Sequence, residues 1–72
     1  MSKFSDSLKE TRMKSGKKQR EAAEYLGVNI RTYQYYEEEK NEPAISTLVQ
    51  LADFFQVSLD ELVGREWSGG VQ

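Results

Sequence analysis

The polar side chains with the most informative spacing fall into two short groups, each standing where a helix is predicted to begin. The first group is Lys17, Lys18, Gln19 and Arg20, and the second is Asn29, Ile30 and Arg31. Backbone N–H groups at a helix start bind phosphate, and nearby cations add to that attraction. An arginine can also donate two hydrogen bonds to the edge of a guanine base. These residue types therefore predict that the chain binds a nucleic acid and catalyses no reaction on it.

Side chains for catalysis and metal binding are scarce. The chain has no His and no Cys, which removes the commonest general base, the thiolate nucleophile and the usual transition-metal ligands. Asp60 and Glu61 are adjacent, so on a helix they would point in different directions. A glycine-rich phosphate loop is also missing from the sequence. We therefore expect no enzyme activity, no cofactor, no metal site and no small-molecule ligand.

The chain has 72 residues and a formal net charge of −2, which indicates one small domain. Residues 1–36 carry eight Lys or Arg and four Asp or Glu, whereas residues 37–72 carry two and eight. The basic first part favours contact with a polyanion. No apolar run approaches the roughly 20 residues of a membrane span, and the first residues lack an apolar signal core. We therefore predict a cytoplasmic protein without a membrane partner.

The stretch between the two polar groups predicts a tight turn that joins two short helices. Ala23 would let two helix axes approach closely, and Gly27 can take the left-handed conformation that ends a helix. Asn29 is a good N-cap for the helix that follows. A small residue, a glycine four positions later and a new helix start are typical of a helix-turn-helix.

Apolar residues at helical spacing predict five helices. The expected ranges are Phe4 to Lys14, Lys18 to Tyr25, Asn29 to Glu37, Ile45 to Phe55 and Ser58 to about Gly64. Ser58 and Glu61 have the spacing of a capping box. We expect an all-α fold, a compact five-helix bundle. Its domain would span residues 1–64, and residues 65–72 would form a short C-terminal tail.

The aromatic residues allow more than one interpretation. Tyr33 and Tyr36 stand three positions apart and are expected in the core, whereas Tyr35 points elsewhere. Phe54 lies off the apolar stripe of its helix and is either a surface aromatic or part of a dimer contact. The same alternatives apply to Trp67 in the tail.

The order of these pieces resembles the Cro/phage-repressor-type helix-turn-helix domains, the xenobiotic-response-element family. The resemblance covers Leu8 to Gly64 and rests on LKETR, QREAAEYLGV, RTYQYYE, Pro43 and STLVQLADFFQVSLDELVG. It implies a lambda-repressor-like domain that binds double-stranded DNA sequence-specifically. The implied function is that of a transcriptional regulator, more specifically a repressor, of phage, mobile-element or bacterial origin. The resemblance also implies a homodimer, at least on DNA.

The resemblance and the basic run together imply roles for particular residues. Contacts to base edges are expected from Ile30, Arg31 and Tyr35. Contacts to phosphates are expected from Lys17, Lys18, Gln19, Arg20, Asn29, Thr32, Gln34 and Lys40. By the resemblance, Gln19 also supports the second helix of the turn, and Arg12 and Glu37 form a structural ion pair. Ala23 and Gly27 are the turn residues.

Acidic residues behind the second helix favour a rival function. Glu38, Glu39 and Glu42 would repel phosphates, so the scaffold could serve instead as a protein-interaction module. It could equally be the antitoxin of a toxin–antitoxin pair. Glu39 stands where the family often has glycine, and a left-handed Glu costs about 1–2 kcal/mol. The helix before it is therefore expected to run on or to end differently. Lys17 also replaces a residue that is usually apolar.

Overall fold

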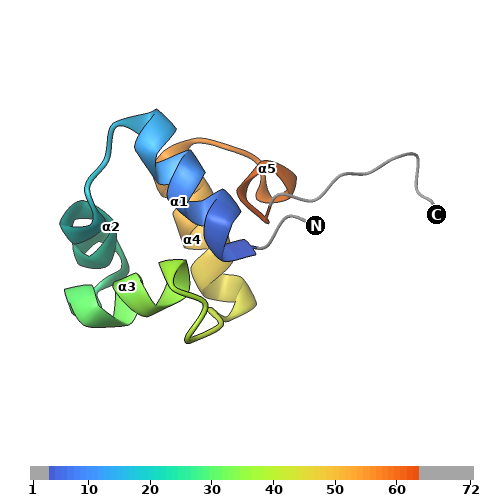
Figure 1. Cartoon of the computed structure of the whole chain (residues 1–72). Coiled ribbons are helices and arrows are strands. Elements are labelled where there is room, and N and C mark those ends of the chain that lie inside the picture. Colours follow the sequence, from blue (N-terminus) through green and yellow to red (C-terminus); the bar gives the residue numbers. More distant parts are fainter. Residues whose placement is uncertain (1–3, 64–72) are drawn as a thin grey trace.

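The computed structural model describes residues 4–63, which form five helices and no strand (Figure 1). The helices are α1 (Phe4–Ser15), α2 (Gln19–Leu26), α3 (Ile30–Glu37), α4 (Ile45–Phe55) and α5 (Leu59–Val63). The all-α prediction is confirmed. The predicted bounds of α4 are the observed ones, and the other helix ends among the described residues lie within one residue of their predicted positions. Gly64, Trp67 and the predicted tail lie outside the described residues.

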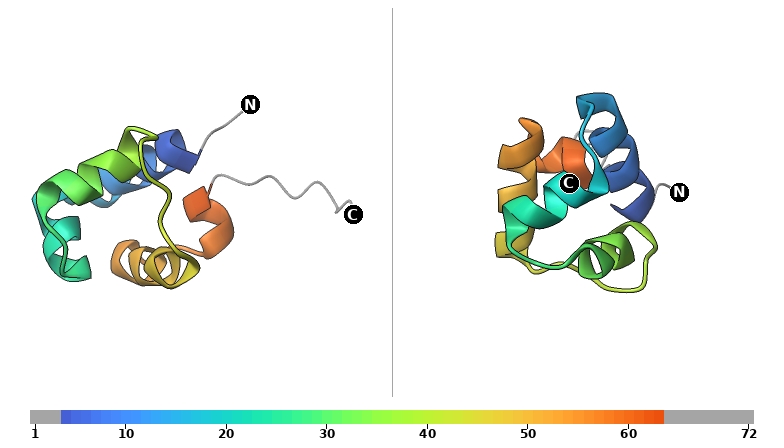
Figure 2. Two further views of the ribbon diagram at one scale, coloured as in Figure 1. Left: turned by 90° about the horizontal axis from the view of Figure 1, so that it is seen from below. Right: turned by 90° about the vertical axis from the view of Figure 1, so that its left-hand side faces the viewer.

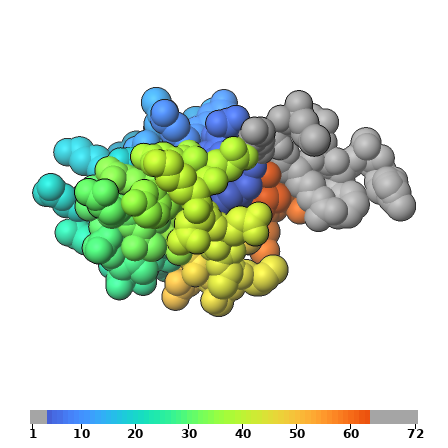
Figure 3. Space-filling model, turned by 60° about the horizontal axis from the view of Figure 1, so that its bottom comes forward, coloured from blue at the N-terminus to red at the C-terminus, as the bar shows by residue number. Residues whose placement is uncertain are grey.

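The helices are arranged so that α3 reaches the surface. α2 and α3 lie together at one end of the molecule, and α5 packs against α1 and α4 towards the other (Figures 1 and 2). α1 contacts α3, α4 and α5, while α4 closes the bundle against α2. The view in Figure 3 looks onto α3, with α2 at one edge and the segment 38–44 beside it. α3 is therefore held by the bundle on one side and open on the other.

Every described helix contributes at least one buried side chain to the core. Its members are Leu8, Ala22, Ala23, Tyr33, Tyr36, Leu51, Ala52, Phe55 and Leu62. Tyr33 and Tyr36 meet edge to face with 6.2 Å between ring centroids, so their predicted core positions are confirmed. Ala23 has 2% of its surface exposed, and because its side chain is a single methyl group, α2 can lie close to its neighbours. Phe54 is half-buried at the edge of this core.

Side-chain caps fix the starts of α3 and α5. The Asn29 side-chain oxygen accepts a hydrogen bond from the Thr32 N–H at 3.0 Å. The Glu61 N–H donates to the Ser58 hydroxyl at 3.1 Å, and the Ser58 N–H donates to the Glu61 carboxylate at 3.1 Å. The predicted capping box is thus confirmed. In the first turn of a helix a backbone N–H has no partner within the helix, and these side chains supply one.

The ends of α3 and α4 use left-handed residues that are not glycine. α3 ends at Glu37, and Glu39 takes a φ of 66°. The expectation that α3 runs on or ends differently because position 39 is not glycine is therefore wrong, since Glu39 takes the left-handed conformation. Gln56 takes a φ of 59° after α4, whereas the turn after α2 uses Gly27 with a φ of 74°. Each non-glycine residue in this conformation costs about 1–2 kcal/mol, which the surrounding packing has to offset.

Candidate nucleic-acid interface

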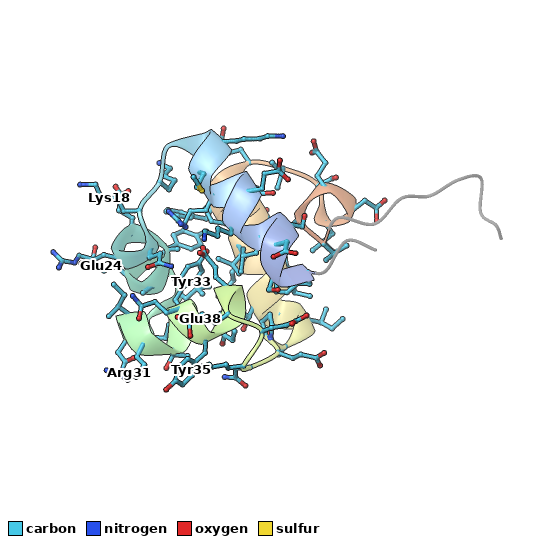
Figure 4. The ribbon with its side chains drawn as sticks, in the orientation of Figure 1. Lys18, Glu24, Arg31, Tyr33, Tyr35 and Glu38 are labelled. Atoms are coloured by element: carbon cyan, nitrogen blue, oxygen red, sulfur yellow. The ribbon has the colours of Figure 1, made fainter. Side chains whose placement is uncertain are left out.

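The exposed side of α3 presents the residues expected to face base edges. Arg31 is exposed and Ile30 keeps 39% of its surface exposed, while Tyr35 is half-buried. Figure 4 shows Arg31 and Tyr35 on the outer side of α3 and Tyr33 pointing back into the bundle. The helical period explains this division, because Tyr33 is displaced from both outer residues by about half a turn.

The inner side of α3 is fixed by a hydrogen-bond network around the Glu37 carboxylate. Arg12 donates to it from Nε at 2.6 Å and from Nη2 at 3.3 Å. Gln19 donates from Nε2 at 3.0 Å, and the Tyr33 hydroxyl donates at 2.6 Å. The Glu37 side chain is 2% exposed and the Arg12 side chain 13%. One buried carboxylate therefore ties α1, α2 and α3 together.

The same network changes the proton affinities of its members. The hydrogen bond to Glu37 raises the pKa of the Arg12 guanidinium, although burial opposes the shift. Burial raises the pKa of the Tyr33 hydroxyl well above its ordinary value, and the hydrogen bond to the Glu37 carboxylate raises it further. Both shifts favour the arrangement in which Arg12 is charged and Tyr33 is neutral.

Gln19 belongs to this network and also contacts Gln34 on α3. Its Nε2 group donates to Glu37, and its side-chain oxygen accepts a hydrogen bond from Gln34 Nε2 at 3.1 Å. Both ends of the Gln19 amide thus hold α3 against the start of α2. Gln34 donates its own side-chain amide to this contact. The structure thus pairs these two expected phosphate ligands with each other, and in this arrangement their amides position α3.

The start of α2 presents two cations and backbone donors to solvent. Lys18 and Arg20 are exposed, and Figure 4 shows Lys18 and Arg31 projecting from the same end of the molecule. The Lys18 N–H donates to the Glu21 carboxylate at 2.7 Å, which caps the helix. The N–H groups of a first helical turn have no partner within the helix. This end of α2 can therefore receive a phosphate group.

Two more of the expected phosphate ligands, both lysines, also have partners within the protein. The Lys17 ammonium lies 5.2 Å from the centroid of the Phe54 ring, and that ring stacks on Tyr25 at 4.7 Å. The Lys40 ammonium lies 5.7 Å from the centroid of the Tyr35 ring and 3.5 Å from a Glu38 carboxylate oxygen. The structure therefore brings Lys18, Arg20 and the first turn of α3 to one end, but directs Lys17 and Lys40 towards aromatic rings.

Sequence reasoning missed two features of this region. The Tyr33 hydroxyl bond to Glu37 was not expected, although a spacing of four residues on a helix places such side chains side by side. Glu24 is exposed and lies at the same end as Lys18 and Arg31 (Figure 4). It adds a negative charge beside the cations, and its position on α2 after Arg20 and Glu21 could have indicated this.

Residues 4–63 contain neither a metal-binding cluster nor a membrane-spanning helix. No group of three or more Asp or Glu side chains in that range is placed to hold a metal ion. None of the helices in that range has the length and apolar character needed to cross a membrane.

The geometry of α2 and α3 defines a helix-turn-helix. Gly27 ends α2 in the left-handed conformation, the Val28 N–H donates to the Ala23 carbonyl at 3.1 Å, and Asn29 starts α3. The helix-turn-helix family model matches residues 8–62. The chain belongs to this family, so the resemblance to Cro and phage-repressor domains is confirmed.

Similar proteins support the same family assignment. The chain is 39% identical over 59 residues to the HTH-type transcriptional regulator ImmR of Bacillus subtilis (strain 168), covering 82% of this chain and 46% of ImmR. It is 33% identical over 63 residues to the cryptic phage CTXphi transcriptional repressor RstR of Vibrio cholerae, covering 88% of this chain and 56% of RstR. The chain thus spans about half the length of these curated relatives.

A solved structure confirms the fold. The crystal structure of a transcriptional regulator from Listeria innocua matches with a TM-score of 0.80 and 34% sequence identity, over 97% of this chain and 65% of that chain. The five-helix, lambda-repressor-like fold is therefore confirmed both by the arrangement of the helices and by this comparison.

Proposed function

We propose that this chain binds double-stranded DNA sequence-specifically and represses transcription by occupying an operator. The observation that carries the proposal is the exposed first turn of α3, with Arg31 on it, held in place by the Glu37 network. In a helix-turn-helix, the start of the second helix meets the floor of the major groove. Arg31 is the residue suited to a guanine edge, and Ile30 offers an apolar contact to a thymine methyl group.

Phosphate contacts would orient α3 in the groove. Lys18, Arg20 and the first turn of α2 would bind the backbone on one side of the groove. Asn29 and Thr32 would add contacts at the start of α3. Such contacts are independent of sequence, so they supply affinity and register, whereas Arg31 supplies discrimination. Repression then needs no chemical step, since the bound protein blocks polymerase. The protein would act in the cytoplasm.

The protein would bind as a homodimer to a near-palindrome with half-sites about one helical turn apart. Exposed apolar side chains on α4 support a protein contact, because Ile45 is 73% exposed and Val49 42%. No charged residue occurs between Pro43 and Ala52, so two copies of this surface would not repel each other. Leu59 on α5 is also 41% exposed. Sedimentation of the free protein and of its DNA complex would give the stoichiometry.

A protein-interaction module is the second candidate. Glu24, Glu38 and Glu42 are all exposed, and carboxylates near α3 lower its attraction for phosphates. An antitoxin would combine DNA binding with the binding of a protein partner. Such a protein would be expected to retain a partner through its acidic or apolar surface, whether or not DNA is present.

The experiment that separates these candidates is binding of the chain to a mixed-sequence duplex across a range of salt concentrations. We expect affinity to fall steeply with salt, because each neutralised phosphate contributes about −0.9 to the slope of log K against log salt. Selection of bound sites from random DNA would then give the operator. Absence of duplex binding at the lowest salt concentration would overturn the DNA-binding proposal and favour the interaction module.

A further inference from the structure

The chain turns sharply at the end of α3, and this turn brings Lys40 beside Tyr35. Glu39 takes the left-handed conformation with a φ of 66°. The next residue, Lys40, donates its N–H to the Tyr35 carbonyl at 3.0 Å. This is the hydrogen bond of a Schellman motif, which turns the chain sharply at a helix end. The backbone of Lys40 is thereby fixed next to Tyr35, one of the residues on the outer side of α3.

The side chain of Lys40 follows its backbone towards Tyr35. Its ammonium lies 5.7 Å from the centroid of the Tyr35 ring and 3.5 Å from a carboxylate oxygen of Glu38. A cation at that distance is attracted by the aromatic ring, and Glu38 neutralises it. The Lys40 and Glu38 side chains remain 63% and 51% exposed. Both side chains are therefore accessible to solvent, and an exposed ion pair of this kind contributes little to folding stability.

We propose that Glu38 and Lys40 form a pair that positions Tyr35 for base recognition and withholds the Lys40 charge from the DNA backbone. The inference rests on the proposed DNA-binding function. Lys40 covers the ring of Tyr35 and limits its movement, while Glu38 holds Lys40 over the ring and cancels its charge. As a result, the pair adds nothing to non-specific affinity. The discrimination between operator and random DNA therefore rises without tighter binding to every sequence.

The decisive measurement is the salt dependence of binding to a mixed-sequence duplex. In Glu38→Gln, Lys40 loses its counter-charge and becomes available to a phosphate. The slope of log K against log salt should steepen by about 0.9, which adds about a threefold affinity loss between roughly 50 and 200 mM salt. Glu38→Asp retains the carboxylate and should keep the parent slope. The matched control is Glu10→Gln, because Glu10 and Lys14 form an exposed pair at 3.8 Å on α1, and this variant should also keep the parent slope.

Testing Glu38→Gln in a second background, Lys40→Met, distinguishes an effect of the Glu38–Lys40 pair from simple repulsion between Glu38 and DNA. Lys40→Met should leave the slope unchanged, because Lys40 contacts no phosphate in the parent. The same variant should reduce the preference for a selected operator over random duplex, because the Tyr35 ring is no longer held. Adding Glu38→Gln to Lys40→Met should change neither value further. An equal steepening by Glu38→Gln in both backgrounds would mean that Glu38 only repels DNA, and this outcome would overturn the inference.

Two other outcomes would also overturn it. A slope flattened by about 0.9 in Lys40→Met would mean that Lys40 already binds a phosphate in the parent. If the parent's affinity for duplex falls steeply with salt, but Glu38→Gln does not change that slope, the inference is wrong and the proposed function stands. A parent that binds no duplex at all would instead remove the proposed function and the inference with it.

Discussion

Arg12 and Glu37 stand 25 positions apart in the chain, and their side chains form an ion pair with an Nε–Oε2 distance of 2.6 Å. The Glu37 carboxylate is 2% exposed and also receives hydrogen bonds from Gln19 and Tyr33. The pair therefore joins the first helix of the bundle to the helix that carries Arg31. Its integrity matters both for folding and for the orientation of α3.

Replacing Arg12 by Ala should lower the free energy of unfolding by about 3–5 kcal/mol, because it leaves a buried carboxylate without its cation. Urea denaturation of the purified protein would measure the loss. Lys14→Ala is the control, since the Lys14 side chain is 77% exposed and pairs with the exposed Glu10. A loss below about 1 kcal/mol for Arg12→Ala would mean that the pair behaves as an exposed one.

The sequence is sufficient to predict features that depend on local spacing. The period of apolar residues predicted each helix, and Tyr33 and Tyr36 were placed in the core because they share a helix face. The Ser58 capping box was predictable because both partners lie within one helical turn. These properties are decided by neighbours in the chain, so no knowledge of the tertiary structure is needed.

Residue spacing did not indicate which partners several side chains find on distant helices. Lys17 belongs to a basic run in the sequence, but its ammonium lies over Phe54 on α4. The destination of a long, flexible side chain depends on which ring another helix brings close to it. In the same way, the Gln19 and Gln34 amides bond to each other because of the crossing of α2 and α3, which the spacing of residues does not specify.

The hydroxyl of Tyr33 should make stability depend on pH in alkaline solution. Burial and the bond to Glu37 raise its pKa in the folded protein. Above the unfolded-state pKa of about 10, the unfolded chain loses this proton while the folded chain keeps it. The unfolded state then binds fewer protons, so the free energy of unfolding falls by about 1.4 kcal/mol per pH unit for this group. Below that pH, its contribution is complete.

Tyr33→Phe tests this assignment. The variant should lose about 1.5–3 kcal/mol at neutral pH, because it lacks a hydrogen bond to a charged group. It should also show a shallower decline of stability above about pH 10 than the parent. Tyr25→Phe is the control, because Tyr25 is 49% exposed and stacks on Phe54. Identical alkaline profiles for the parent and Tyr33→Phe would contradict the role assigned to the hydroxyl.

The left-handed residue after α4 offers a route to higher stability. Gln56 has a φ of 59°, which is unfavourable for a side chain but not for glycine. We expect Gln56→Gly to raise the free energy of unfolding by about 1 kcal/mol. Gly27→Ala is the reciprocal variant. An added Cβ at Gly27 has no heavy atom within 4 Å, so its expected loss of about 1–2 kcal/mol reflects backbone conformation alone. Thermal denaturation of both variants should show shifts of opposite sign.

Lys17 should behave as a packing residue, although it adjoins Lys18. Its ammonium lies over the Phe54 ring and its side chain is half-buried. Lys17→Met keeps the length and apolar contacts of the side chain and removes its charge. We therefore expect its stability to stay within about 0.5 kcal/mol of the parent and its salt slope for duplex binding to stay the same. A flattened slope would show that Lys17 reaches a phosphate in the complex.

Arg31 and Lys18 should affect DNA binding in different ways, because one is expected at a base edge and the other at a phosphate. Arg31→Ala should lose about 1–3 kcal/mol of binding free energy on the selected operator and relax specificity at one base pair. Lys18→Ala should weaken binding to all duplexes alike and flatten the salt slope by about 0.9. Titrations of operator and mixed-sequence duplexes at several salt concentrations would separate these effects. If Arg31→Ala weakened both duplexes equally, Arg31 would be a backbone contact and the reading face of α3 would have to be assigned to other residues.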